Sequence, residues 1–238
     1  MSFTGKNILV VGGSSGTGKA VIHLLASRNA TIYNASRSRG DDWPEGVNHL
    51  TLDVMEDVTP LASYLPESLH GVVYCVGSIN LKPFTRLSPE DFLRDYRLNV
   101  VGAASVIQQA LKPLQNAGTG SVVLISTVAA KAGMSYHASI AAAKRGLEGL
   151  ALSLAAELAP KQIRVNVIAP SLTDTPLAGS LLSTPEKREA SAKRHPLGRF
   201  GTVNDLAQAT AFLLSEDSSW ITGQIIGIDG GLGSLRNL

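Results

Sequence analysis

A glycine-rich turn near the start of the chain, Gly12-Gly13-Ser14-Ser15-Gly16-Thr17-Gly18, has residue types that can bind a phosphate. The turn follows the apolar run 8–11 and precedes a helix-compatible stretch, so it predicts a strand that turns tightly into a helix. Glycines allow positive φ and close backbone approach, and the unpaired amides and dipole of a helix N-terminus attract an anion. Such a turn can also be no more than tight, but its place directly after the first strand favours a dinucleotide site.

Arg37 follows the second apolar run, at the place where dinucleotide-binding folds contact the ribose. Many NAD sites have a carboxylate there, whereas a guanidinium pairs with a 2′-phosphate. Asp41 and Asp42 lie further into the loop, and Arg37 could instead be a solvated surface charge. The position of Ser36 and Arg37 therefore predicts NADP as the cofactor, with NAD as the less favoured alternative.

Two later strand ends offer further contacts to a dinucleotide. Asp53 ends the third apolar run, where its carboxylate could accept a bond from an adenine amino group or only stabilise a turn. Gly77 ends the fourth run, where a strand edge could pass close to the cofactor.

Hydroxyl and amide side chains further along could act on a substrate. Ser126 and Thr127 end another apolar run, and ligands of open α/β sheets bind at the carboxyl ends of strands. Either hydroxyl could bond a substrate carbonyl, or both could merely cap or turn the chain. Asn99 interrupts an otherwise apolar helical stretch and needs a partner if it is buried, which could be neighbouring backbone or a group beside an active site.

The elements that must position these residues alternate along the chain. Short apolar runs predict strands near 7–11, 30–36, 47–53, 71–76, 120–126, 163–169 and 224–228, and longer helical patterns predict helices near 17–28, 57–65, 89–114, 139–159 and 203–215. This alternation predicts an α/β fold, a Rossmann-like doubly wound parallel sheet of about seven strands with helices on both faces. No linker or repeat is visible, so we expect one domain spanning residues 1–238.

Composition limits the partners. With 44% hydrophobic residues, 17% charged residues and a net charge of +2, the chain gives no reason to expect nucleic-acid or membrane binding. The lone Cys75 excludes an internal disulfide framework, and the lack of a signal-peptide layout predicts a soluble, cytoplasmic protein. Four of the histidines, His23, His49, His70 and His195, show no metal-ligand spacing, so no metal is expected.

Together these motifs resemble the short-chain dehydrogenase/reductase family over nearly the whole chain. The matching segments are the glycine turn (TGxxxGxG in the family, with Val11 in place of threonine), the adenine-contacting pair Asp53-Val54, the strand and turn Ile163-Arg164-Val165-Asn166-Val167-Ile168-Ala169-Pro170, and the C-terminal signature in 196–201 and 222–231. The resemblance implies an oxidoreductase that moves a hydride between a nicotinamide and a carbonyl or alcohol. It also implies a dimer or tetramer built partly from helices 98–115 and 139–159.

The resemblance assigns roles residue by residue. Asn99 falls at the family's structural asparagine, Ser126-Thr127 at its catalytic serine, and Lys144 at the lysine of its YxxxK motif. Pro170, Thr173 and Thr175 would lie near the nicotinamide amide and the phosphates. The segment 172–196 corresponds to the variable substrate loop, in which Leu177, Leu181 and Leu182 could line an apolar pocket or pack into the core.

The chain departs from the family pattern where the chemistry is performed. Ile140 stands four residues before Lys144, in the place of the catalytic tyrosine, and isoleucine has no exchangeable proton. Tyr74-Cys75-Val76-Gly77 replaces the family's NNAG, and Ser171 replaces a glycine.

A neighbouring side chain could take over the proton transfer. His137 lies three residues before Ile140 and seven before Lys144, so all three could share one helical face, and imidazole has a suitable pKa. His137 could instead be a surface or packing residue at the helix N-terminus. Tyr136 or a water molecule are the other possibilities, and a loop at 134–137 would let either side chain turn inward.

Three functions compete. The first is an NADP-dependent oxidoreductase with an atypical active site, and the second is a weak or inactive dinucleotide-binding protein such as a redox sensor or partner subunit. The third is a structural oligomer subunit, which the retained hydroxyls, Lys144 and Asn99 argue against. A hydroxyl and a lysine at both family positions favour the oxidoreductase.

Overall fold

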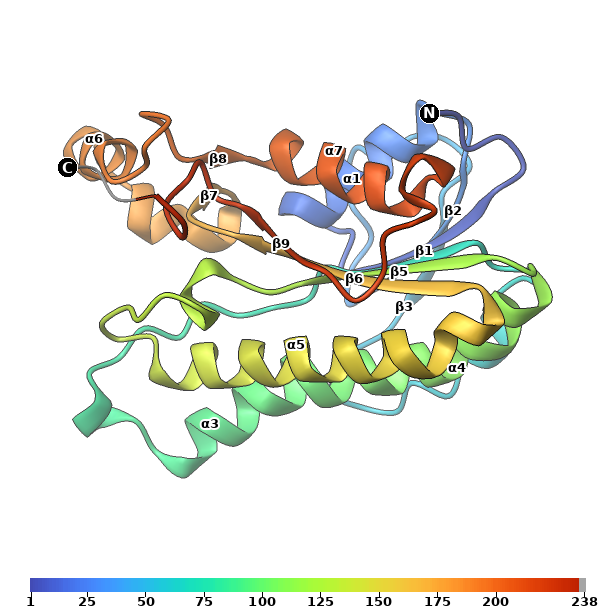
Figure 1. The fold of residues 1–238 in the computed structure, drawn as a ribbon, viewed down its shortest axis with the longest axis horizontal. Coiled ribbons are helices and arrows are strands. Elements are labelled where there is room, and N and C mark those ends of the chain that lie inside the picture. Colours follow the sequence, from blue (N-terminus) through green and yellow to red (C-terminus); the bar gives the residue numbers. More distant parts are fainter. Residues whose placement is uncertain (236–238) are drawn as a thin grey trace.

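Seven parallel strands form the centre of the molecule, in the spatial order β3-β2-β1-β4-β5-β6-β9 (Figure 1). A computed structural model describes residues 1–235; the last three residues of the expected domain lie outside this range. The strands are β1 Asn7–Val11, β2 Thr31–Ser36, β3 Asn48–Thr51, β4 Gly71–Tyr74, β5 Gly120–Ile125, β6 Ile163–Pro170 and β9 Ile225–Ile228. The expected doubly wound parallel sheet is confirmed.

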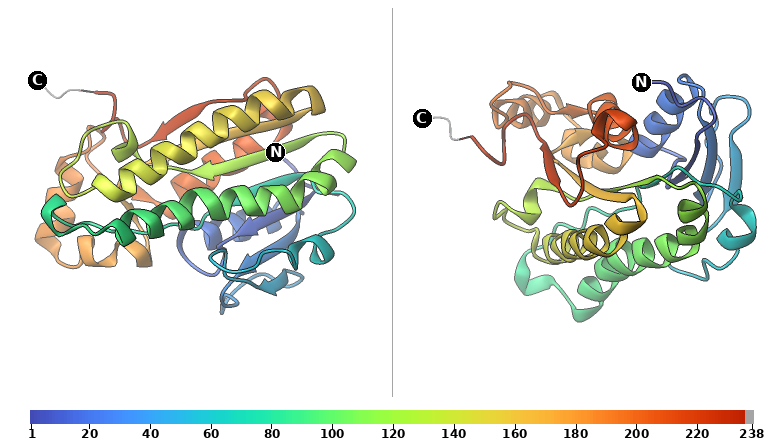
Figure 2. Two further views of the ribbon diagram at one scale, coloured as in Figure 1. Left: turned by 90° about the horizontal axis from the view of Figure 1, so that it is seen from below. Right: turned by 45° about the vertical axis from the view of Figure 1, so that its right-hand side comes forward.

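Helices cover both faces of this sheet. The helices α1 (Gly16–Ala26) and α7 (Val203–Leu214) lie on one face, and α3 (Pro89–Tyr96), α4 (Gly102–Asn116) and α5 (Ala138–Leu158) lie on the other (Figure 1). Figure 2 shows the α3–α4 segment running alongside α5. No helix among residues 1–235 is long and apolar enough to span a membrane.

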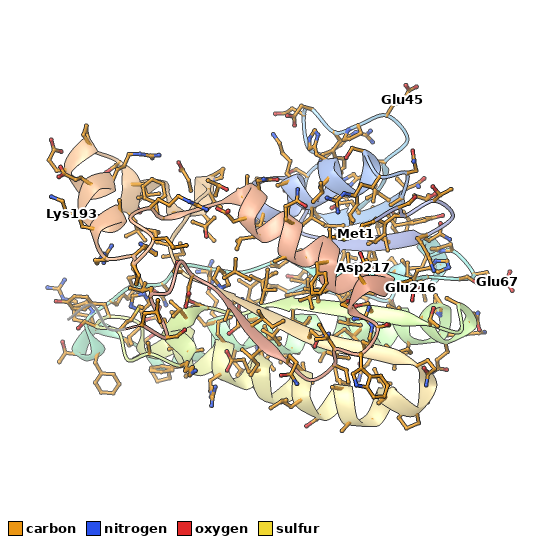
Figure 3. All side chains as sticks on the ribbon, turned by 45° about the horizontal axis from the view of Figure 1, so that its top comes forward. Met1, Glu45, Glu67, Lys193, Glu216 and Asp217 are labelled. Atoms are coloured by element: carbon orange, nitrogen blue, oxygen red, sulfur yellow. The ribbon has the colours of Figure 1, made fainter. Side chains whose placement is uncertain are left out.

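Strand alternation explains the two cores. Leu9 and Val11 pack with Leu147 in the layer of α4 and α5, whereas Ile8 and Val10 pack toward α1 and α7. Successive side chains of a strand point to opposite faces, so each apolar run supplies both layers. Charged side chains such as Glu45, Glu67 and Lys193 instead extend from the outside of the fold (Figure 3).

The sheet also creates a crevice. The chain moves outward from β1 to β2 and β3 in one direction and from β4 to β5, β6 and β9 in the other. The carboxyl ends of β1 and β4 are therefore followed by connections that diverge, which is where open α/β sheets bind ligands.

Two helix expectations were wrong in part. The stretch 57–65 contains only α2 (Leu61–Tyr64), because both carboxylate oxygens of Asp57 accept bonds from Thr59 and hold a turn. The stretch 89–114 is divided by a π-helical turn, Arg97–Val101. There the Asn99 side chain donates to the Asp95 carbonyl at 2.8 Å and occupies the acceptor that the Asn99 amide would use in an α-helix.

A small substructure beyond β6 was not predicted. It contains the strand pair β7 (Thr173–Asp174) and β8 (Gly201–Thr202), the short 3₁₀ helix Pro176–Leu182, and α6 (Pro185–Lys193). In Figure 1 it lies beyond the carboxyl end of β6, and its residues Thr173, Leu177 and Leu181 line the cavity at that end of the sheet.

Candidate functional site

The glycine turn leaves the first amides of α1 without a side-chain acceptor. Gly12 has φ of 85°, and a Cβ on Gly18 would overlap the carbonyl oxygen of Gly12, so the backbone folds closely on itself. Ser15 precedes α1 but forms no capping bond with its side chain. The amides of this first turn can therefore bond an anion.

A polar side chain inside β2, Asn34, holds the glycine turn by a hydrogen bond, a role that was not predicted from the sequence. The buried Asn34 accepts a bond from the Gly13 amide at 2.9 Å and donates to Ser36 Oγ at 2.7 Å. Trp43 Nε1 donates to the Gly13 carbonyl at 2.9 Å. The signal available in the sequence was the polar side chain of Asn34 in the middle of a strand that is otherwise mostly apolar.

Arg37 lies at the end of β2 with an exposed guanidinium that bonds no other residue in the described range 1–235. The nearby charges are already paired, since Asp42 accepts from Lys19 at 2.8 Å and Arg39 lies over the Trp43 ring at 5.5 Å. Lys19 also lowers the pKa of Asp42. The free guanidinium can therefore accept an anionic partner from solution.

Asp53, which follows β3, supports a turn and also lines the cavity. One carboxylate oxygen accepts from the Met55 amide at 2.9 Å, which supports the turn expected there. The residue is only partly buried and lines the same cavity as Arg37, so the second oxygen remains available.

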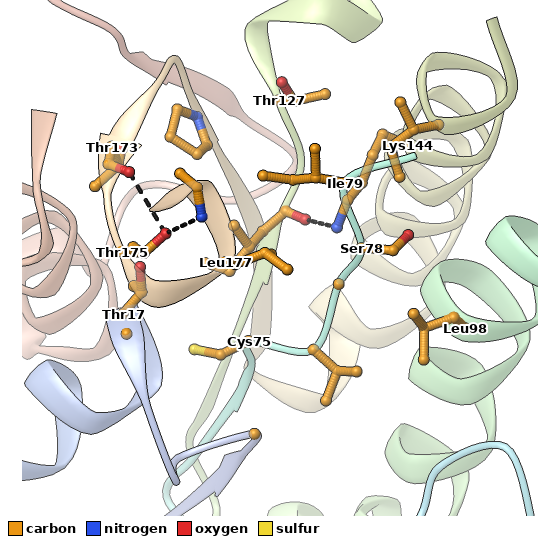
Figure 4. A pocket seen from close by; sticks show the side chains of 18 of the residues that line it. Thr17, Cys75, Ser78, Ile79, Leu98, Thr127, Lys144, Thr173, Thr175 and Leu177 are labelled. Carbon is orange, nitrogen blue, oxygen red and sulfur yellow. Dashed lines mark hydrogen bonds between the residues drawn. The ribbon is translucent and has the colours of Figure 1, made fainter. Parts of the chain in front are cut away.

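One cavity of about 1090 Å³ brings almost all of the candidate residues together. Its wall includes every residue expected to bind the cofactor: Gly12, Ser14, Ser15, Gly16, Thr17, Gly18, Ser36, Arg37, Asp53, Val54, Gly77, Lys144, Pro170, Thr173 and Thr175. Ser126, Thr127, His137 and Ile140 also line it. Figure 4 shows Thr17, Thr127, Thr175 and Lys144 around this space.

The two adjacent hydroxyls of the β5 segment have different surroundings. Ser126 is 3% exposed and donates to the buried carboxylate of Glu148 at 2.7 Å, which also binds Arg145 at 2.6 Å. Thr127 is partly exposed, and its Oγ1 accepts from the Ala129 amide at 3.3 Å, which leaves its own proton free. Thr127 is thus the hydroxyl available to a ligand.

Lys144 carries a buried ammonium on the wall of the same cavity. Its Nζ donates to the Ile125 carbonyl at 2.6 Å, and burial lowers its pKa to about 8 (Figure 4). A Cβ at Gly77 would lie 3.4 Å from Nζ and 3.6 Å from Asn99 Oδ1, so the glycine keeps the space between them open. The neighbouring Cys75 is not a nucleophile in this site, because burial raises the pKa of its thiol to about 12.

Asn99 lies behind this space and does not line the cavity. Its Oδ1 is fully buried and has no hydrogen-bond partner among the described residues. The expected bond to neighbouring backbone is present, through Nδ2 and the Asp95 carbonyl. Tyr74 supports the same turn by donating to the Leu98 carbonyl at 2.6 Å.

Ile140 forms part of the cavity wall one turn before Lys144 and is 5% exposed. Helix α5 begins at Ala138 and His137 is its N-cap residue, so His137 lies at the helix N-terminus, which is the alternative expected for it. His137 Nδ1 lies 2.7 Å from the Ser135 carbonyl, and the ring lines the cavity. Tyr136 is 59% exposed and does not line it.

The substrate loop shapes the far side of the cavity. Thr175 caps the 3₁₀ helix that follows it by accepting from the Ala178 amide at 3.2 Å (Figure 4). Leu177 and Leu181 line the cavity, whereas Leu182 is buried in the core. Two of these leucines therefore line the pocket and the third packs into the core, which are the two alternatives expected for them.

Further polar residues of the cavity wall were not identified from the sequence. Ser78 Oγ donates to the buried Asp95 at 2.7 Å. Lys82 bonds Asp91 at 2.7 Å and, with further hydrogen bonds, holds the pKa of that carboxyl at about 2. Separate elements supply these residues, so no local motif indicates them. In the described part of the chain no cluster of histidine, cysteine and carboxylate residues could hold a metal.

The chain is similar to known reductases over most of its length. A family model described as enoyl-(acyl carrier protein) reductase matches residues 47–233. The 3-oxoacyl-[acyl-carrier-protein] reductase of Thermotoga maritima is 33% identical over 252 residues, covering 98% of this chain and 99% of its own.

Solved structures agree with the sequence match. A short-chain type dehydrogenase/reductase from Mycobacterium ulcerans superposes with a TM-score of 0.90 at 31% identity, covering 100% of this chain and 93% of its own. ElxO with NADP bound superposes with a TM-score of 0.89 at 27% identity, covering 97% of this chain and 99% of its own.

Proposed function

Because the chain belongs to the short-chain dehydrogenase/reductase family, we propose that it is an NADP(H)-dependent oxidoreductase acting on a carbonyl or alcohol substrate. The observation that carries this proposal is the single cavity lined by the glycine turn, Arg37, Thr127 and Lys144. These residues come from four separated segments of the chain, and the sheet brings them to one edge.

The cavity residues fit a phosphorylated dinucleotide. The uncapped amides of α1 would hold the pyrophosphate, and the unpaired Arg37 would hold the 2′-phosphate. Asp53 would meet the adenine, Lys144 the ribose, and the segment 170–175 the nicotinamide end. The likeness to ElxO, described with NADP bound, supports this assignment.

The chain's own residues would then bind and polarise the substrate oxygen. A bound nicotinamide supplies the hydride in reduction and accepts it in oxidation. Thr127 would donate its proton as a hydrogen bond to the oxygen, and the Lys144 ammonium would stabilise negative charge developing there. The leucines of the substrate loop would accommodate an apolar substrate chain.

Ile140 favours a second candidate function, that of a weak or inactive dinucleotide-binding protein such as a redox sensor or partner subunit. The buried isoleucine stands where the family resemblance places a proton-donating phenol.

One experiment separates the two functions. Purified protein is titrated with NADPH by fluorescence and then assayed by NADPH absorbance with a panel of ketones, aldehydes and 3-oxoacyl thioesters. We expect binding and turnover of at least one carbonyl. Tight NADPH binding without turnover would favour the non-catalytic function, and failure to bind NADPH would contradict the proposed NADP(H) site.

A further inference from the structure

A serine and a histidine of the cavity wall form a hydrogen-bonded pair. Ser171 Oγ lies 2.8 Å from His195 Nε2, and His195 Nδ1 lies 2.7 Å from the Ser191 carbonyl. A carbonyl can only accept, so Nδ1 carries a proton and Nε2 of the neutral ring accepts the Ser171 hydroxyl. The three groups are thus a hydroxyl (Ser171), a base (His195) and a carbonyl that orients the base (Ser191).

Three segments fix the imidazole ring. Ser191 belongs to α6, Ser171 follows β6, and a Cβ on Gly230 in the turn after β9 would lie 3.6 Å from His195 Cδ2. His195 is only 3% exposed, yet both Ser171 and His195 line the cavity.

The register of the sheet places this pair near Thr127. Ile125 of β5 is paired with Ile168 of β6, and Thr127 keeps an extended backbone with φ of −157° and ψ of 149°. Continuing the register brings Thr127 level with Pro170, one residue before Ser171. Ser171 lies just after the last residue of β6, and it lines the same cavity as Thr127.

We propose that Ser171 and His195 form the proton-transfer pair for the substrate oxygen, in the role that Ile140 cannot perform. The proposal rests on the oxidoreductase function above. In reduction the carbonyl carbon accepts a hydride from the reduced nicotinamide, and the oxygen takes the hydroxyl proton of Ser171. Ser171 recovers a proton from Nε2 of the protonated His195, leaving alcohol and a neutral ring. In oxidation the neutral ring receives the alcohol proton through Ser171.

The charged side chains of Arg194 and Asp229, on segments close to the His195 ring, form hydrogen bonds with groups other than this ring. Arg194 donates to Ser191 Oγ at 3.0 Å, and the carboxylate of Asp229 accepts from the amides of Gly231 and Gly233. Within residues 1–235 His195 has no ion-pair partner, so no charged side chain competes with Ser171 for its Nε2.

The first test needs no substrate. The ¹⁵N NMR spectra of histidine-labelled protein are compared in complex with NADPH and with NADP⁺, and the His195 signal is assigned from a His195→Gln variant. We expect the ring-nitrogen signals of His195 to differ between the two complexes, because Ser171 and His195 line the cavity and their hydrogen bond would respond to the change of charge on a bound cofactor. His70, at the amino end of β4, is the control and should not respond. Identical His195 signals in both complexes would overturn the proposal.

The second test uses the carbonyl panel. Ser171→Ala and His195→Gln should each lower kcat by about tenfold or more while NADPH binding stays unchanged. His23→Gln, on α1 outside the cavity, is the matched control and should keep wild-type rates. Full activity of the Ser171 variant would overturn this inference and leave the proposed function standing. A wild type that fails to bind NADPH would be a failure of the proposed function instead.

Discussion

Ser126 and Thr127 are adjacent residues with opposite surroundings, and we expect opposite effects when each is changed. Thr127→Val removes the free proton and should lower kcat about 100-fold, while Thr127→Ser should retain most activity. Ser126→Ala should instead lower the free energy of unfolding by about 1–3 kcal/mol, because the buried Glu148 loses a donor. Carbonyl reduction rates and urea unfolding measure the two effects. The reverse pattern would show that Ser126 is the hydroxyl that meets the substrate.

Lys144 should make stability depend on pH in the alkaline range. Burial lowers its pKa from 10.5 to about 8, so between these values the unfolded chain holds a proton that the folded protein has lost. Stability therefore rises with pH across this window, by about 3 kcal/mol in total.

Urea unfolding of wild type and Lys144→Met at pH 7 and pH 10 measures this contribution. The free energy of unfolding of the wild type should rise relative to that of the variant. A constant difference between the two proteins would show that the ammonium is not held in a desolvated site.

At the scale of elements, the π-helical turn between α3 and α4 depends on the Tyr74 hydroxyl. A Cβ on Gly102 would lie 2.6 Å from that hydroxyl, so Gly102→Ala should lower the free energy of unfolding by about 1–3 kcal/mol despite the better helix propensity of alanine. The loss should be smaller in a Tyr74→Phe background, where the oxygen is absent. A double-mutant cycle by urea unfolding measures the coupling, and additive effects would contradict it.

Helix α5 places positions 140 and 144 one turn apart on the cavity wall. Ile140→Tyr would put a phenol beside the Lys144 ammonium, and we expect kcat for a reduced carbonyl to rise about tenfold or more. Ile140→Phe is the matched control, because it adds the ring without the hydroxyl. Equal rates in the two variants would show that a phenol at this position cannot reach the substrate oxygen.

The strands and long helices could be predicted from the sequence because their apolar periodicity is strong. Helix α6 carries almost no apolar face, and the π-helical turn arises from a side-chain bond of Asn99, so neither leaves a periodic signal. The alternation of β5 did contain a signal that separates its two hydroxyls. Val122 and Leu124 face α5, and Ser126 continues that face toward Glu148.

At the scale of the whole molecule, the sequence could indicate which residues line the site but not how they are paired there. All fifteen residues expected to bind a cofactor line one cavity, because motifs at the carboxyl ends of parallel strands meet at one edge. The pair of Ser171 and His195 joins two segments separated by the substrate loop, and a bond between them depends on the fold of that loop. Contacts of this kind have no local pattern.

The central claim, an NADP(H) site built on the glycine turn and Arg37, is tested most directly by fluorescence titration of NADPH and NADH. We predict that NADPH binds at least about tenfold more tightly than NADH, and that Arg37→Ala abolishes this difference without weakening NADH binding. Equal or tighter binding of NADH by the wild type would contradict the account.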